Sequence, residues 1–320
     1  MNITINFKTL FKSVKVFVAL LVMLFTLNQS IYGARVDKSG MFDNTFKTAL
    51  PQTAVAEMVN EHFDAPLPRG KTVKKCFIFG YDGARCDGLF NIKGMENSAV
   101  NAVAASGGLY VSYAGGTDKV LNAQATSTGP GWASILTGKW AKDTGVKNNG
   151  QLLNSDCRTV LTSLVESGKA DSAAFMCIWD GHITGENATY REEARYTMAN
   201  DIDVRWETYS WDDALHQALL SEAASPACAD IVFFVYERPD SAGHGKGFSN
   251  DVPEYVEAIK GCDRDAYDLI RTIEARSTYA GEDWLFIITS DHGGHGTSHG
   301  SQHVDCRMTY IATNKAIAMD

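Results

Sequence analysis

The chain has 320 residues, of which 45% are hydrophobic and 21% charged, and its formal net charge at pH 7 is −9. This composition excludes disordered, collagen-like and coiled-coil proteins, and the length allows one large hydrophobic core or two modest ones. Because an acidic surface repels polyanions, we do not expect a nucleic-acid polymer as a partner.

The N-terminal residues have the pattern of a secretory signal peptide. Lys8, Lys12 and Lys15 precede an uncharged apolar run at residues 16–27, which is the order of charge and hydrophobicity that such signals use. The run is shorter than the roughly 20 residues that a membrane-spanning helix needs. We therefore predict a signal peptide over residues 1–34 and an exported mature chain without a stable membrane span. An uncleaved signal that anchors the chain is the alternative.

All seven cysteines lie after the predicted signal peptide, and no two of them form a Cys-x-x-Cys pair. A thiolate metal site is therefore not expected. Export would permit one to three disulfide bonds, and the odd number leaves at least one thiol free in a monomer.

A polar lead segment over residues 35–69 contains a predicted helix at residues 53–63 and ends in a proline-rich stretch. Beyond it, short apolar runs of β type alternate with longer segments of helical spacing. The runs lie at residues 76–81, 109–113, 173–179, 231–236 and 284–289, and the helical segments at residues 97–105, 132–137, 159–167, 212–224 and 252–276. Strands that are apolar throughout and separated by helices predict one α/β domain over residues 70–320, with a mainly parallel sheet covered on both faces.

Three of the predicted strands are followed by side chains of the types that bind metals. Asp82 follows the first apolar run, Asp240 and His244 follow the fourth, and Asp291 and His292 follow the fifth. In an open parallel sheet, ligands bind beyond the carboxyl ends of the strands. One Asp after a strand is usually a helix cap or a turn residue, but three such positions, two of them with a histidine, are hard to explain as caps. Carboxylates and imidazoles without thiolates suit Zn²⁺ or Mn²⁺.

A possible nucleophile lies in the segment 125–138. Thr128 has the chemistry of a helix N-cap, Pro130 fits the first turn and Gly138 fits the end of the helix. A hydroxyl at a helix start lies near free backbone N–H groups that favour a bound phosphate, although the same position suits an ordinary cap. Because a threonine hydroxyl is a poor nucleophile at neutral pH, a catalytic role requires contact with a metal that lowers its pKa.

Together these motifs, from residue 75 to about residue 313, resemble the alkaline phosphatase superfamily and, within it, the type I phosphodiesterase/nucleotide pyrophosphatase family. The resemblance implies a three-layer α/β/α fold with a mostly parallel central sheet. It also implies two divalent metal ions, with Zn²⁺ favoured, one of them held by Asp82, Thr128, Asp291 and His292.

The second ion, by the same resemblance, is held by Asp240, His244 and a later histidine. His295, His299 and His303 compete for this place. We choose His299 because a glycine follows it, as in the family, whereas no glycine follows His303 and His295 lies only three residues beyond the histidine of the first site.

The implied activity is hydrolysis of a small phosphate diester or nucleotide pyrophosphate through a phosphothreonine at Thr128. Where eukaryotic members carry an Asn three residues after the nucleophile, this chain has Gly131, so contacts to the phosphate must come from elsewhere. A sulfatase is disfavoured, since the segment lacks the convertible Cys or Ser and the Arg that sulfatases need. Relatives usually continue beyond the position of Asp320, so we expect a trimmed fold or a fragment.

Two alternatives to a phosphodiesterase remain. The first is a phosphomonoesterase with the same metals, which would add a Lys or Arg over the phosphate; Lys139, Lys142 and Lys147 follow the nucleophile segment but are expected on the solvated surface. The second is an inactive extracellular binding protein on the same fold. Its signature would be a missing ligand or nucleophile, and all seven expected positions are filled.

Overall fold

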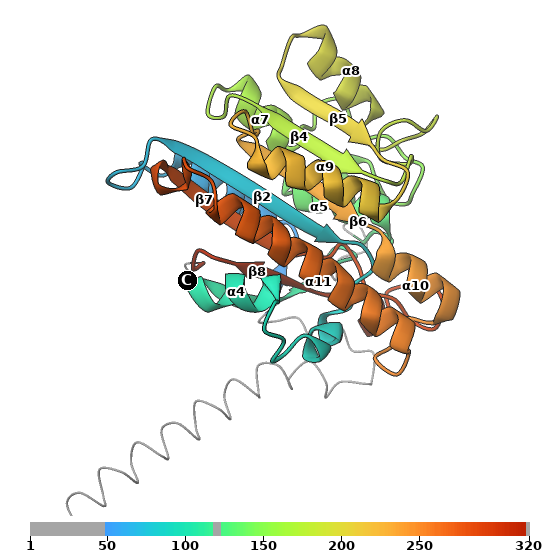
Figure 1. Cartoon of the computed structure of the whole chain (residues 1–320). Coiled ribbons are helices and arrows are strands. Elements are labelled where there is room, and N and C mark those ends of the chain that lie inside the picture. Colours follow the sequence, from blue (N-terminus) through green and yellow to red (C-terminus); the bar gives the residue numbers. More distant parts are fainter. Residues whose placement is uncertain (1–48, 118–122, 318–320) are drawn as a thin grey trace, which may run out of the picture. The chain divides into compact units, whose positions relative to one another are not determined.

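The centre of the molecule is an eight-stranded sheet with the order β1-β3-β8-β7-β2-β6-β4-β5 (Figure 1). The structure is a computed structural model that describes residues 49–117 and 123–317. The predicted signal peptide at residues 1–34 lies outside the described residues. The strands are β1 (Leu50–Pro51), β2 (Val73–Tyr81), β3 (Gly108–Tyr113), β4 (Ala173–Cys177), β5 (Val204–Thr208), β6 (Ile231–Tyr236), β7 (Glu282–Thr289) and β8 (Met308–Thr313).

Helices cover the sheet, and short 3-10 turns lie at Cys86–Asn91 and Tyr279–Gly281. None of the helices in the described part of the chain is both long and apolar enough to cross a membrane. The helices are α3 (Ala54–Asp64), α4 (Ala99–Ser106), α5 (Thr128–Thr137), α6 (Ala141–Thr144), α7 (Val160–Glu166), α8 (Arg191–Ala199), α9 (Asp212–Ala224), α10 (Arg238–Lys246), α11 (Pro253–Glu274) and α12 (Val304–Arg307).

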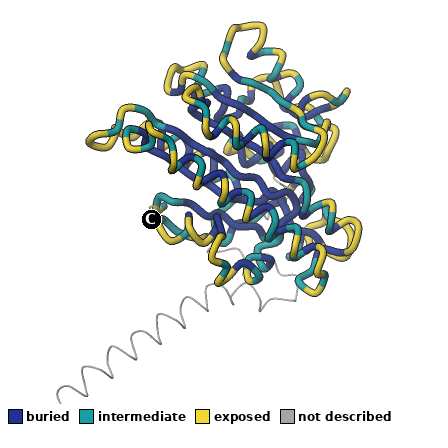
Figure 2. The backbone as a smooth tube through the Cα atoms, viewed as in Figure 1, coloured by how far each residue is buried: buried dark blue, intermediate teal, exposed yellow. Residues whose placement is uncertain are grey.

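Two hydrophobic cores lie on the two faces of the sheet. Phe77, Phe79 and Tyr81 of β2 pack in one core with α4, α9 and α11. Cys76 and Ile78 of the same strand pack in the other with α3, α5 and α7. Because both faces of this central strand are covered, its residues from Cys76 onward are all buried, as Figure 2 shows for the strands at the centre of the molecule.

The three layers confirm the predicted α/β/α fold with a mostly parallel sheet. Strand β8 runs antiparallel to both of its neighbours, β3 and β7. The other pairings in the described sheet are parallel. The apolar run at residues 231–236 and the helix at residues 212–224 have the predicted ends.

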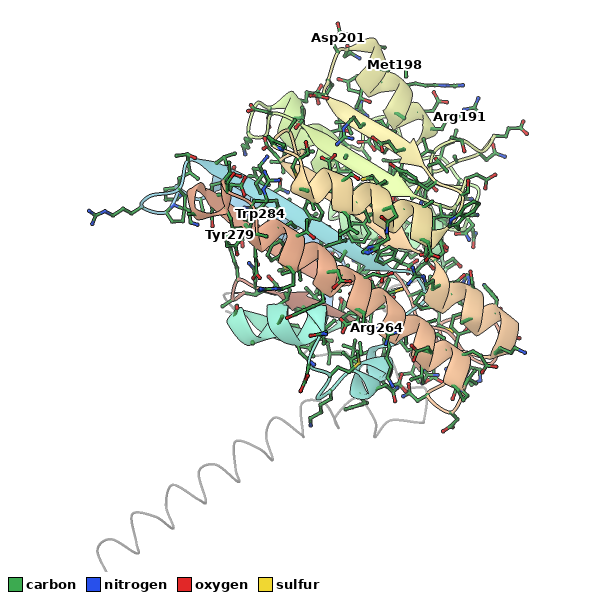
Figure 3. All side chains as sticks on the ribbon, in the orientation of Figure 1. Arg191, Met198, Asp201, Arg264, Tyr279 and Trp284 are labelled. Atoms are coloured by element: carbon green, nitrogen blue, oxygen red, sulfur yellow. The ribbon has the colours of Figure 1, made fainter. Side chains whose placement is uncertain are left out.

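Several elements were not predicted, and each has a weak sequence signal. Strand β5 is at the edge of the sheet and keeps one buried residue, Val204. Helix α10 contains two glycines and a proline, which are poor helix formers. Helix α8 lies beside β5 at the outer end of the molecule, where Figure 3 labels the exposed Met198.

The cysteines are a further feature of the core, because most of them are buried. All seven are free thiols, and six of them are buried. The disulfide bonds that export would permit therefore do not form in this structure. Trp284 of β7, labelled in Figure 3, is 4% exposed, and its ring stacks on that of Phe286 in the same strand.

Candidate metal-binding active site

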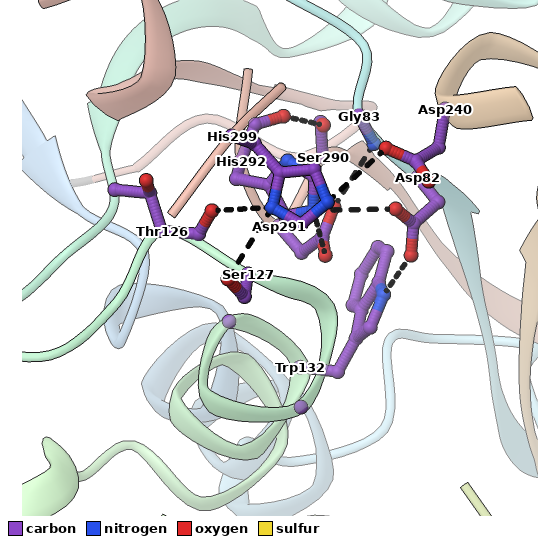
Figure 4. Close-up of polar contacts among 12 residues, drawn as sticks. Asp82, Gly83, Thr126, Ser127, Trp132, Asp240, Ser290, Asp291, His292 and His299 are labelled. Atoms are coloured by element: carbon purple, nitrogen blue, oxygen red, sulfur yellow. Dashed lines mark hydrogen bonds and ion pairs between the residues drawn. The ribbon is translucent and has the colours of Figure 1, made fainter. Parts of the chain in front are cut away.

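Three adjacent strands bring the predicted metal ligands to one edge of the sheet. β2 lies between β7 and β6, and Tyr81 at its end is paired with Tyr236 at the end of β6. Asp82 follows β2 directly, while Asp240 lies in the first turn of α10, soon after β6. Because the three strands are parallel and end together, side chains that are far apart in sequence meet here (Figure 4).

Asp82, Asp291 and His292 form the first cluster, and all three side chains are fully buried. His292 Nε2 lies 3.4 Å from Asp82 Oδ1 and 3.3 Å from Asp291 Oδ2. Four ligands arranged tetrahedrally around an ion at about 2.0–2.1 Å lie about 3.3 Å from one another. The three atoms are therefore spaced as ligands of one shared ion.

Asp240, His244 and His299 form the second cluster. His244 lies one turn after Asp240 on α10, and its Nε2 is 3.4 Å from Asp240 Oδ2. His299 Nε2 lies 3.7 Å from Asp240 Oδ1. The ring of His299 stacks on that of His292 with 4.0 Å between the centroids, so the two clusters adjoin.

The three histidines of these clusters use their ring nitrogens in the same way. A backbone carbonyl that accepts a hydrogen bond from Nδ1–H leaves the lone pair on Nε2, which is the form of imidazole that binds a metal. The Nδ1 atoms of His244, His292 and His299 lie 3.0, 2.7 and 3.1 Å from the carbonyl oxygens of Thr297, Gly293 and Thr126. In each ring, the nitrogen that faces the carboxylates is therefore the one free to bind an ion.

The atoms that face the centre of the site have no hydrogen-bond partner. They are Asp82 Oδ1, Asp240 Oδ1, Asp291 Oδ2 and His292 Nε2. The other oxygens of two carboxylates are held, since Trp132 Nε1 donates to Asp82 Oδ2 over 3.0 Å and Gly83 N–H to Asp291 Oδ1 over 3.2 Å (Figure 4). Each unsatisfied buried polar atom costs about 1–3 kcal/mol or more. Bound cations would satisfy all four atoms.

The pKa shifts of the buried carboxyl groups also favour a bound cation at this site. Without a cation, burial and then the charge of Asp240 raise the pKa of Asp82 well above its ordinary value. Burial and then the charge of Asp82 do the same to the pKa of Asp291. Within residues 49–117 and 123–317, the ion pairs of these three carboxylates involve only histidines. Divalent ions reverse such pKa shifts and keep carboxylates ionised.

Thr128 lies at the same edge, at the start of α5. Its side chain is buried and close enough to Asp82 to lower the pKa of that carboxyl, against the larger effect of burial that raises it. The expectation that Thr128 is the N-cap was wrong: Ser127 has the extended backbone of the cap, and Thr128 is the first helical residue. The adjacent Gly129 N–H is not free, because it donates to Asn149 Oδ1 over 2.8 Å.

Close backbone approach explains two glycines around the site. A Cβ atom at Gly131 would lie 2.7 Å from Asp291 Cβ, so α5 packs directly against Asp291 at the end of β7. A side chain at this position would require α5 or the segment after β7 to move. Gly83 has φ +68°, and a Cβ there would lie 2.9 Å from Asp240 Cα. Gly131 therefore allows close packing of α5 on the end of β7, and Gly83 allows close packing of the turn after β2 on α10.

His295 and His303 lie outside these clusters. Their Nδ1 atoms approach Asp305 Oδ2 instead, at 3.0 and 3.6 Å. Both side chains are exposed, at 59% and 43%. Of the three competing histidines, the structure brings only His299 beside Asp240.

Sequence reasoning missed three further residues of the site, which are Trp132, Gly80 and Glu237. Trp132 holds Asp82 through its indole N–H, and Gly80 on β2 leaves room for the indole ring. Glu237 directly follows β6, which is the same signal that identified Asp82. Its Oε1 lies 4.0 Å from Nε2 of His182, which is fully buried.

Solved structures with a similar fold include sulfatases, nucleotide pyrophosphatases and a phosphonoacetate hydrolase. A putative sulfatase from Bacteroides thetaiotaomicron superposes with a TM-score of 0.50 at 12% identity, over 78% of this chain and 66% of that one. Two other neighbours are murine ectonucleotide pyrophosphatase / phosphodiesterase 5, inactive, in complex with AMP, and phosphonoacetate hydrolase from Sinorhizobium meliloti 1021 in complex with phosphonoformate.

These two neighbours have TM-scores of 0.46 and 0.45 at 15% and 16% identity, and cover 69% and 71% of this chain. The chain spans 57% of the length of each. No match to the sequence was found among curated proteins. Residues 78–320 match the profile of the family described as Type I phosphodiesterase / nucleotide pyrophosphatase. The chain belongs to this family.

Proposed function

We propose that this protein is a metal-dependent hydrolase of small phosphate diesters or nucleotide pyrophosphates that uses Thr128 as its nucleophile. The observation that carries the proposal is the set of four buried, unpartnered ligand atoms on Asp82, Asp240, Asp291 and His292. Family membership supports the reaction class.

Two divalent ions would be bound by the two clusters. Asp82, Asp291 and His292, together with Thr128, would hold one ion. The second cluster, Asp240, His244 and His299, would hold the other. Carboxylate oxygens and imidazole nitrogens favour Zn²⁺. When bound, such ions supply positive charge that lowers the pKa of a hydroxyl and stabilises a departing oxygen.

The chain's own residues would orient the attack. The Thr128 hydroxyl is held against Asp82, and Trp132 fixes the second oxygen of that carboxylate. In the first step a bond forms between Thr128 Oγ1 and phosphorus while the bond from phosphorus to the leaving oxygen breaks. Water then cleaves the phosphothreonine and restores Thr128. The buried walls of the site hold the hydroxyl in one position, which is the main contribution of such a scaffold.

We prefer a diester over a monoester as the proposed substrate. A monoester carries one more negative charge, and enzymes that cleave it need extra positive charge over the phosphate. Lys139, Lys142 and Lys147, which follow the nucleophile, are all exposed. These lysines therefore do not supply the charge that a monoesterase needs.

We also propose that the mature chain acts after export. The basic and apolar N-terminal residues, 8–27, are the support for this proposal. Its substrate would then be a small phosphate ester outside the cytoplasm, and an uncleaved anchor at the membrane is the alternative.

The nucleophile is tested by comparing Thr128→Ala with Thr128→Ser. We expect Thr128→Ala to abolish hydrolysis of bis-p-nitrophenyl phosphate, because no hydroxyl remains to attack, while Asp82, Asp291 and His292 still bind the first ion. Thr128→Ser keeps the hydroxyl and should keep measurable activity. Rates with p-nitrophenyl phosphate, and rates after chelation, test the preference for diesters and the need for metal.

The matched control is Thr137→Ala, at the other end of α5, where the hydroxyl donates to Ala133 O over 2.6 Å and accepts from the Lys139 N–H over 3.2 Å. This variant should turn over substrate like the parent. Metal content and circular dichroism of all three variants separate loss of chemistry from loss of structure. A Thr128→Ala variant with nearly the parent's rate would rule out the phosphothreonine route.

A further inference from the structure

We propose that His295, His303 and Asp305 form a third metal site, at the surface, that binds a divalent transition-metal ion. The site is separate from the two clusters described above. It does not depend on the proposed function, since none of its three residues is assigned a part in the reaction.

The side chains already converge as ligands do. The Asp305 carboxylate accepts from His295 Nδ1 over 3.0 Å, and His303 Nδ1 lies 3.6 Å from the same oxygen. The ligand atoms of the three residues all lie within 4.8 Å of one another. These separations bracket the value of about 3.3 Å expected between neighbouring ligands of a tetrahedral ion. Little movement would be needed to bind one.

The two imidazole rings favour an ion over a simple hydrogen bond. Their centroids are 3.9 Å apart with an angle of 32° between the planes. Both rings also face the same oxygen of Asp305, so a nitrogen of each ring and that oxygen converge on one point. An ion that binds one nitrogen from each neutral ring uses both rings and the carboxylate together.

Neighbouring contacts hold the three residues in place. The other carboxylate oxygen of Asp305 is 3.4 Å from Arg85 Nη2, and Arg85 itself donates to the Phe248 carbonyl over 2.7 Å. The backbone of His295 pairs with that of Ser298 in a short bridge. Two contacts of the Nδ1 atoms would be replaced on binding: the His295 Nδ1 bond to Asp305 Oδ2 over 3.0 Å, and the bond that the Asp305 N–H donates to His303 Nδ1 over 3.2 Å.

The donor set indicates the class of ion. Two imidazole nitrogens and one carboxylate oxygen suit Zn²⁺, Ni²⁺ or Cu²⁺ rather than Mg²⁺ or Ca²⁺, which prefer oxygen ligands alone. The exposed side chains leave the remaining positions to water. The three residues lie at the two ends of the segment 295–305, which also contains His299. A bound ion would therefore link the two ends of this segment.

The site is tested by Ni²⁺ titration of the full chain after its active site has been loaded with Zn²⁺. We expect one further Ni²⁺ to bind the parent protein and none to bind the double variant His295→Ala/His303→Ala. Asp251→Asn, a change at an exposed carboxylate elsewhere, is the control and should bind like the parent.

Both histidines are exposed, so the double variant should fold. His303→Asn alone is the milder version and should weaken Ni²⁺ binding by at least about ten-fold, because even the loss of a group that only orients a ligand typically costs that much. Thermal unfolding with and without Ni²⁺ gives a second measurement, in which the ion raises the Tm of the parent only. No extra Ni²⁺ in the parent, or equal binding by the double variant, would overturn the proposal. Neither result depends on turnover of a phosphate ester.

Discussion

Trp132 connects the helix that carries the proposed nucleophile to a proposed metal ligand. Its indole N–H donates to Asp82 Oδ2 over 3.0 Å, and the ring is fully buried above Gly80 of β2. A partner that orients a ligand in this way typically affects metal affinity or activity by about 10- to 100-fold. The residue therefore acts by positioning Asp82 and not through contact with substrate.

Trp132→Phe should lower both metal affinity and the rate of diester hydrolysis by roughly 10-fold or more, since the donor to Asp82 is lost while most of the ring volume remains. Excess metal should restore part of the rate, which a purely structural defect would not allow. Trp140→Phe is the matched control, because Trp140 stacks on Tyr113 away from the carboxylates. Equal metal affinities for Trp132→Phe and the parent would show that the indole does not position Asp82.

At the scale of elements, the close packing of α5 on the end of β7 sets the distance between nucleophile and ligands. Gly131 permits this packing, because a Cβ there would lie 2.8 Å from the backbone oxygen of Asp291. The neighbour in this contact is backbone and cannot rotate away. Any side chain at position 131 must push the helix and the strand end apart.

Gly131→Ala is thus expected to destabilise the protein by about 1–3 kcal/mol, the usual cost of overpacking a core, and to weaken metal binding at Asp291. Denaturant unfolding with and without metal measures both effects. Gly245→Ala on α10 is the control: a Cβ there meets no atom within 4 Å, so better helix propensity should leave stability unchanged or slightly higher. A Gly131→Ala variant as stable as the parent would refute the packing argument.

For the molecule as a whole, stability should depend on pH through Asp263, where α11 packs against α4. Its Oδ1 accepts from the Val100 N–H over 2.9 Å, and burial raises the pKa of Asp263 from 3.8 to about 6. The folded protein therefore binds this proton more tightly than the unfolded chain does. The resulting contribution to stability is fully present below pH 3.8 and is lost as the pH rises through about 6.

Asp263→Asn keeps an acceptor for Val100 but cannot ionise. Its stability relative to the parent should therefore increase between pH 5 and pH 8 by about 1.4 kcal/mol, which is roughly half of the whole contribution of about 3 kcal/mol, because the unfolded chain is already largely ionised at pH 5. Urea unfolding at the two pH values measures this difference. Asp268→Asn, an exposed change on the same helix, should show none. A stability difference between Asp263→Asn and the parent that is the same at both pH values would contradict the assignment.

Local patterns in the sequence determined the fold class and most of the residues at the site. Strands buried on both faces must be apolar throughout, so β2, β6 and β7 are evident from their residues alone, and so is an aspartate within a few residues after each strand. Asp82, Asp240 and Asp291 therefore followed from one rule about parallel sheets. The edge strand β5 and the glycine-containing helix α10 escaped prediction because their stability comes from neighbours and not from local propensity.

Only the tertiary structure decided which distant side chains act on one another. The indole of Trp132 meets Asp82, and Gly131 meets Asp291, although each pair is far apart along the chain. The choice among His295, His299 and His303 likewise depends on where the loop passes Asp240, because all three lie in one short polar segment. Such contacts are set by the packing of helices on the sheet, which leaves no periodic signal in the sequence.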